Sequence, residues 1–385
     1  MSILINYKLS KLLDIKLEDG STTDLIINDD LSILEKTSEF TITEQIINLT
    51  KSEKLKTNYK YKYDFLYAYT ENHEKITLYD VSFAINFFVD SIGEFIFCTN
   101  SFLVGDFIEN ILEHEISKLK IEIKDSYPSI FEKIKDFSFV GNGVHVCYEK
   151  IYDFLDMESP FACFKQIGFE KLYDNRCYII LSTNKNKKFN DLRNLLFYLC
   201  DYLFLILSDY PEFNNFVLEF DNQQHKLYAF GNKYIKQNRK SYLPRNTYSL
   251  SFRNTFNNWC KFRSDSGIIF DIFKQTVYSN SFEEDYPLRF TQCLEGLMIF
   301  LKHSTQNTNL VDTLKKAIIL TNYNLYPFST DVRDEFVKKT KNHRHLFSHA
   351  KYKGKKLEGE ENKEVAIALY GIIRELIVKY ISEGK

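Results

Sequence analysis

The sequence predicts an α+β N-terminal domain followed by an all-α helical bundle. Up to about residue 235, hydrophobic residues recur mostly at every second position, as they do in half-buried strands. Beyond that point they recur at three- and four-residue steps, as on one face of a helix. The stretch 236–247 between the two patterns is polar and basic and contains Pro244. Such a stretch is typical of a connection, so we expect one domain over residues 1–240 and a second over residues 241–385.

Composition limits the function classes. With 385 residues, 44% of them hydrophobic, the chain can bury two cores. The net charge is −2, so any contact with a nucleic acid must use a local basic patch. Seven cysteines without a Cys-x-x-Cys pair favour a reducing cytoplasm over a disulfide framework. The first residues lack the pattern of a signal peptide, and the longest apolar run, residues 195–207, is too short for a bilayer. We therefore expect a cytoplasmic protein.

In the first domain, short runs rich in aromatic and β-branched residues between Asn, Asp and Gly indicate strands. We expect strands at residues 39–44, 59–64, 93–98, 137–140, 144–148, 176–181, 216–220 and 226–230. Two helices are expected among them, at residues 104–120 and 190–208. The second begins with Asn190 and Asp191, which suit a helix start, and has a dense apolar interior.

In the second domain we expect five helices, at residues 249–279, 285–304, 308–322, 330–352 and 361–381. The last has apolar residues on one side at three- and four-residue steps: Val365, Ala366, Leu369, Ile372, Ile373, Leu376 and Tyr380. Amphipathic helices with short links predict a bundle.

Residues 342–349 (NHRHLFSH) concentrate an arginine and three of the eight histidines of the chain. On a helix, Arg344 and His349 lie roughly 140° apart around the axis, which a long arginine side chain can span. An arginine can grip a phosphate with two hydrogen bonds, and a histidine can move a proton near neutral pH. Although Arg-x4-His is a short and unspecific spacing, the pair predicts an RNA-cleaving site.

Further features of residues 241–385 carry a family resemblance. The second expected helix contains Arg289-Phe290 followed by Leu294-Glu295, and a long closing helix follows a lysine-rich loop after Arg344 and His349. Together they resemble a HEPN domain, and most closely the Apea-like HEPN family of bacterial defence proteins, whose signature is an arginine, four to six residues and a histidine. The residue after that arginine is often asparagine in the family and is His345 here.

The resemblance implies a HEPN-type bundle and a homodimer, with Arg344 and His349 of both chains lining one cleft. It implies metal-independent endoribonuclease activity, without a cofactor, in a toxin of antiphage defence by abortive infection. His349 would act as general base or acid, and Arg344 would offset the charge of the transition state. Alternatively, the domain is a catalytically inert interaction or RNA-binding module of the same fold.

Several neighbours are candidates for supporting roles. Glu295 would either orient Arg344 or form a purely structural salt bridge in the bundle. Asn342, His343, His345 and Ser348 would touch phosphate or ribose, although such residues are more often solvated or capping. The surrounding cluster is rich in lysine, and those expected to bind RNA are Lys338, Lys339, Lys341, Lys351 and Lys353. The same lysines also fit an ordinary solvated face.

Two further expectations concern a rival site and the first domain. His345 and His349, four positions apart, have the spacing of zinc ligands on a helix. The metalloprotease motif would need a glutamate directly after the first histidine, and Leu346 stands there. Residues 1–240 show no catalytic constellation, so we expect them to hold the ribonuclease inactive until a trigger, such as a phage-derived one, arrives.

Overall fold

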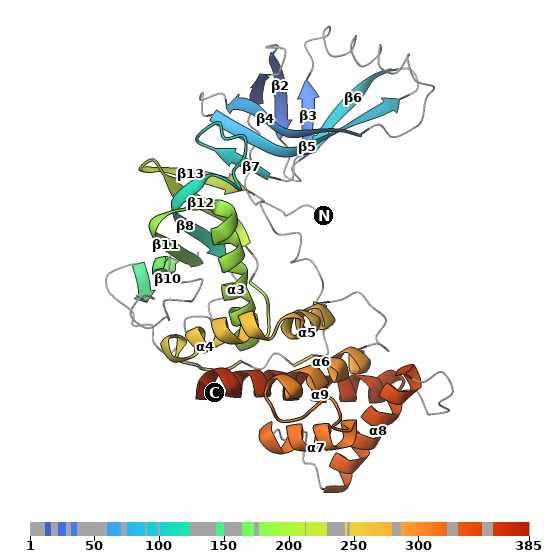
Figure 1. Cartoon of the computed structure of the whole chain (residues 1–385). Coiled ribbons are helices and arrows are strands. Elements are labelled where there is room, and N and C mark those ends of the chain that lie inside the picture. The colour runs from blue at the N-terminus through green and yellow to red at the C-terminus, as the bar shows by residue number, and fades with distance from the viewer. Residues whose placement is uncertain are drawn as a thin grey trace.

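The computed structural model describes the strand-rich and helical parts of the chain with gaps. The described residues are 12–16, 22–27, 32–36, 60–70, 75–88, 91–98, 101–123, 144–149, 164–172, 177–211, 213–228, 243–244, 247–278, 286–321, 330–348 and 357–384. An antiparallel sheet region comes first and a helical region follows (Figure 1). This confirms the predicted class at that level.

The first six strands form a closed ring in which every neighbouring pair is antiparallel. Around the ring the order is β4 (Lys60–Thr70), β1 (Leu12–Lys16), β2 (Thr22–Ile27), β3 (Ser32–Lys36), β6 (Ser91–Cys98) and β5 (Lys75–Phe88). The ring closes because β5 also pairs with β4, with Leu66 opposite Leu78. The alternating Tyr and Lys residues of β4 match the strand predicted at 59–64.

The other seven strands that the structure describes extend the sheet from the ring. β5 pairs with β7 (Ser101–Val104), and the order continues through β13 (Gln223–Tyr228), β12 (Phe213–Phe220), β8 (Glu115–Ile123), β11 (Cys177–Lys188), β10 (Phe164–Leu172) and β9 (Val144–Glu149). In β8 the apolar Ile116, Leu119, Ile121 and Ile123 are buried. They belong to the same buried core as the helix α3 (Phe189–Leu207), which contacts β8 and β11 (Figure 1).

Among the described residues, six helices follow the last strand. They are α4 (Phe252–Asp265), α5 (Ile268–Tyr278), α6 (Tyr286–Phe300), α7 (Leu310–Thr321), α8 (Thr330–Ser348) and α9 (Gly359–Glu383). α6 and α9 are the central pair, because α6 contacts α5, α7, α8 and α9, and α9 contacts α4, α6, α7 and α8. Six of the seven residues predicted for the apolar side of α9 are buried, and Tyr380 packs against the core from its edge. None of the described helices is long and apolar enough to cross a bilayer.

Two predicted helices were wrong in detail. Residues 104–120 form the end of β7, a turn and most of β8 rather than a helix. Apolar residues at 104, 107, 108 and 111 imitate a helical period, but Gly105 breaks it with φ +126°. Residues 249–279 form two helices, because Gly267 adopts φ +54° between α4 and α5. The strands predicted at 39–44 and 137–140 lie outside the described residues.

α3 precedes the predicted domain boundary but packs into the helical region. The Tyr202 hydroxyl lies 2.6 Å from the Thr255 hydroxyl of α4, and Trp259 of α4 donates its indole N–H to the Tyr198 carbonyl at 2.9 Å. Arg374 of α9, 1% exposed, donates to the carbonyls of Leu205 and Ile206 in the last turn of α3. Buried apolar residues of the sheet, of α3 and of the later helices therefore form one continuous core.

Gly105 lies where the ring meets the rest of the sheet, and alanine there should destabilise the fold. A Cβ at residue 105 would lie 2.6 Å from Nδ1 of His225, which is 2% exposed and stacked on Phe220. Backbone strain and overpacking together should lower the free energy of unfolding by about 3 kcal/mol. Denaturant titration of Gly105→Ala measures the loss.

Gly267→Ala is the matched control for that substitution. Gly267 also has a positive φ, but a Cβ there would have nothing within 4 Å. Only the left-handed backbone conformation is then penalised, at about 1 kcal/mol. Equal losses for the two variants would contradict the steric role assigned to His225.

Candidate active site

The candidate site lies on α8, whose buried face follows a regular spacing. Phe336, Val337, Thr340 and His343 are buried, at steps of three and four residues. The Thr340 hydroxyl donates to the Phe336 carbonyl at 2.8 Å, so its polar atom is satisfied within the helix. Lys338 and Lys341 point away from this face and are exposed. The sequence around the predicted motif is therefore an amphipathic helix.

Arg344 is placed at the border of this buried face, one turn after Thr340. Its Nε donates to the Oε2 atom of Glu295 on α6 at 3.4 Å. The side chains are 28% and 32% exposed, so the ion pair is partly shielded from water. Glu295 follows the buried Leu294 on α6, which contacts α8. The contact predicted between these two residues is thus present in the structure.

This contact defines what Arg344 can do chemically. The single contact from Nε to Glu295 restrains the guanidinium group, which carries five N–H donors in a rigid planar fork. A restrained planar fork favours a defined orientation, as bidentate binding of a phosphate requires. A partly exposed position also lets a ligand reach the group. The geometry suits both a phosphate-binding arginine and a structural tie between α6 and α8.

His343 has a structural position that the sequence reasoning missed. It is 1% exposed, its Nδ1 accepts the backbone N–H of Leu357 at 3.3 Å, and its ring lies 5.0 Å from that of Phe347. His343 therefore joins α8 to the residues just before α9. The spacing could have predicted this burial, because residues 336, 340 and 343 lie on the same side of a helix.

The other predicted site residues are described to different extents. Asn342 and His345 lie on α8 and are partly exposed. Ser348 is the last residue of α8, and its side chain is not described. His349, Lys351 and Lys353 lie outside the described residues. The pairing of Arg344 with His349 therefore stays a prediction.

Of the predicted RNA-binding lysines on α8, Lys339 has carboxylate partners. Its Nζ lies 2.9 Å from Glu335 and 3.3 Å from Glu361 of α9. The hydrogen bond to Glu335 raises the pKa of Lys339, so the residue remains charged and joins two helices. Lys338 and Lys341 lie on the exposed side of the same helix. Lys339 thus has a structural role that the prediction did not include.

The described part of the chain contains no group of three or more side chains able to hold a metal ion. Because His349 lies outside that part, the alternative zinc site of His345 and His349 stays a prediction.

Fold and site together define an antiparallel sheet region joined to a helical bundle that carries a partly buried arginine–glutamate pair. No family model, curated protein or solved structure matches the chain in the comparisons.

Proposed function

We propose that the protein is a metal-independent endoribonuclease of the HEPN type, formed by residues 241–385. The observation that supports this proposal best is the 3.4 Å contact between Arg344 and Glu295. It restrains the arginine of the motif on a helix whose outer side carries Lys338 and Lys341. An oriented guanidinium beside exposed lysines is suited to a phosphate of the RNA backbone.

The chemistry needs little from the protein, because RNA carries its own nucleophile in the 2′-hydroxyl. Arg344 would hold the adjacent phosphate and offset the negative charge that grows in the transition state. His349 would take the proton from the 2′-hydroxyl or give one to the leaving 5′-oxygen. In a homodimer formed through the helical region, the two copies of His349 would share these two tasks. No metal or cofactor takes part.

In the proposed role the protein is a cytoplasmic toxin that acts in antiphage defence by abortive infection, with tRNA as one candidate substrate. An unregulated ribonuclease in the cytoplasm would harm its own cell. We therefore infer that the strand-rich N-terminal region controls the site and responds to a phage or cellular trigger.

The direct test is incubation of the purified full-length protein with total RNA in EDTA. We expect cleavage to proceed in the chelator and to leave 2′,3′-cyclic phosphate and 5′-hydroxyl ends, because the 2′-oxygen is the nucleophile. End mapping by ligation-based sequencing measures both. Cleavage that stops in EDTA and returns with zinc would reject the metal-independent mechanism.

A second candidate is an inert module of the same fold that binds RNA or a protein partner. The observation that favours it is again the Glu295 contact, since an arginine already paired with a carboxylate is also a common structural tie between helices. RNA binding without any cleavage by the wild-type protein, under conditions in which it is folded and dimeric, would select this candidate.

A further inference from the structure

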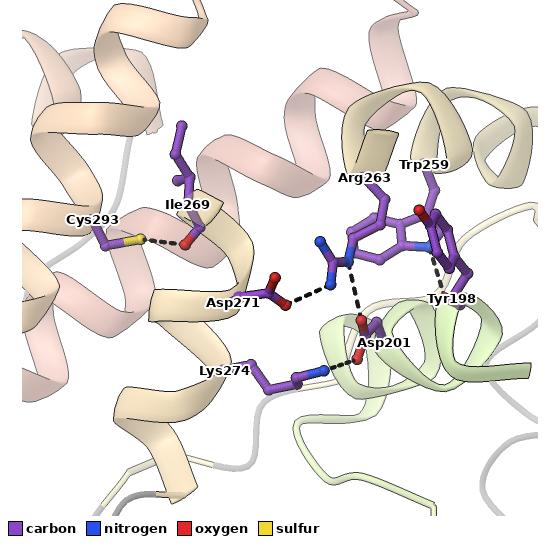
Figure 2. A network of polar contacts seen from close by, with 8 residues as sticks. All are labelled: Tyr198, Asp201, Trp259, Arg263, Ile269, Asp271, Lys274 and Cys293. Atoms are coloured by element: carbon purple, nitrogen blue, oxygen red, sulfur yellow. Dashed lines mark hydrogen bonds and ion pairs between the residues drawn. The ribbon is translucent and has the colours of Figure 1, made fainter. Parts of the chain in front are cut away.

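An ionic cluster centred on the buried Asp201 joins α3 to α4 and α5 (Figure 2). Asp201 of α3 is 1% exposed, and its carboxylate accepts from Arg263 Nε of α4 at 3.1 Å and from Lys274 Nζ of α5 at 2.7 Å. Arg263 also donates to Asp271 of α5. Two carboxylates thus balance two cations. Such a cluster holds three helices in register, because separating buried opposite charges is costly.

The same contacts continue from α5 to α6. The Cys293 thiol of α6 donates to the Ile269 carbonyl of α5 at 3.4 Å (Figure 2). The Ile269 side chain covers Gly296, where an added Cβ would lie 3.4 Å from its Cγ1 atom. Glu295, the partner of Arg344, stands between these two contact points on α6. The α5–α6 packing therefore sets where Glu295 is presented to α8.

The opposite end of α3 is held by the junction between the ring and the rest of the sheet. The backbone N–H groups of Phe189 and Asn190 donate to the carbonyls of His114 and Leu112 at 2.8 and 2.9 Å. The turn that contains these carbonyls is bonded to β5 of the ring, since the Tyr79 hydroxyl donates to the Ile108 carbonyl at 2.7 Å. With 19 residues, α3 spans about 28 Å from this junction to the helical region.

We propose that α3 positions the Glu295–Arg344 pair and transmits movements of the strand-rich region to it through Asp201, Arg263 and Asp271. When α3 shifts, α4 and α5 follow it because their charges stay paired, and α6 follows α5. Any effect on RNA cleavage rests on the proposed function. The mechanical coupling itself rests only on the contacts described above.

The test is hydrogen–deuterium exchange of α8 amides in the full-length protein without RNA. Asp201→Asn keeps the side-chain shape but removes the carboxylate that pairs with the partly buried Lys274. We expect it to speed exchange over residues 333–348 by about fivefold or more. In a Glu295→Gln background, where the last link to Arg344 is already weakened, the same substitution should change α8 exchange less than about twofold.

A milder variant and a control keep the result interpretable if Asp201→Asn impairs folding. Asp271→Asn removes the next carboxylate in the series, at a residue whose side chain is 38% exposed, and should act on α8 in the same direction. Asp265→Asn makes the same change at an exposed aspartate in the last turn of α4 and should leave α8 exchange unaltered.

Unchanged α8 exchange in both Asp201→Asn and Asp271→Asn would overturn the coupling. The coupling would also be overturned if Asp201→Asn accelerated α8 exchange equally in the wild-type and Glu295→Gln backgrounds. Equal acceleration would mean that the substitution destabilises the helical region as a whole. These outcomes are independent of ribonuclease activity. If the protein does not cleave RNA but the dependence on Glu295 is found, the coupling stands and the proposed function fails.

Discussion

Arg344→Ala is expected to lower the rate of RNA cleavage by about two to three orders of magnitude, because the transition state loses the cation that offsets its growing charge. His349→Ala should cost about two to four orders of magnitude through loss of proton transfer. In cells, overexpression of the wild-type protein should arrest growth, and both substitutions should relieve the arrest. Cleavage of a labelled RNA in EDTA and growth curves measure the two effects.

The matched control for Arg344 is Arg333→Ala, which removes an exposed arginine from the first turns of the same helix. The rate of cleavage should stay within about threefold of wild type, because one exposed positive charge adds only modestly to the affinity for the RNA backbone. Circular dichroism and thermal unfolding establish that each variant is folded. If the Arg344 and His349 variants are folded and remain as toxic as wild type, the catalytic assignment is wrong.

Arg374→Ala should produce the largest loss of stability, about 3–5 kcal/mol, because it leaves a cavity in the core and takes the guanidinium donor from two carbonyl groups, of which Ile206 still accepts from the Tyr248 N–H. The guanidinium donates to Leu205 and Ile206 at the end of α3 and lies over the ring of Tyr248 at 4.8 Å. The C-terminal end of a helix also favours a positive charge. Denaturant titration of the full-length protein measures the change.

Lys379 of the same helix provides the comparison. It also donates to a carbonyl in the last turn of a helix, Leu320 of α7 at 3.0 Å, but its side chain is 43% exposed. Water can replace the lost hydrogen bond there, so Lys379→Ala should change the free energy of unfolding by no more than about 0.5 kcal/mol. Similar losses for both variants would show that burial of Arg374 contributes little.

The sequence predicted the helical region best, because its apolar residues follow one period over long segments. α9 was expected at 361–381 and is Gly359–Glu383, and α3 was expected at 190–208 and is Phe189–Leu207. The error at residues 104–120 arose where a turn imitates the helical period. The closed order of six strands was not predicted, because strand partners are chosen by tertiary packing rather than by local pattern.

In the candidate site, one of the two roles left open for Glu295 required a contact with Arg344, and the two residues are in contact although 49 residues separate them. That expectation came from the family resemblance and could not have come from spacing alone. The burial of His343 was not predicted, because a histidine within a motif of functional residues was interpreted as a ligand-contacting group. His343 in fact lies on the same buried side of α8 as Phe336 and Thr340. The partners of Lys339 were also missed, since one of them, Glu361, belongs to another helix.

Because α3 belongs to the same core as the later helices, the two halves of this gene product cannot be separated at residue 240 without damage. A fragment that begins there loses the Tyr198 carbonyl that accepts from Trp259 and the Asp201 carboxylate that neutralises Arg263. The face that α3 covers would become solvent-exposed and prone to self-association. A truncation that starts ahead of Phe189 keeps α3 with the later helices, but it exposes the side of α3 that contacts β8 and β11, so the helical half is expected to be stable only with the sheet attached.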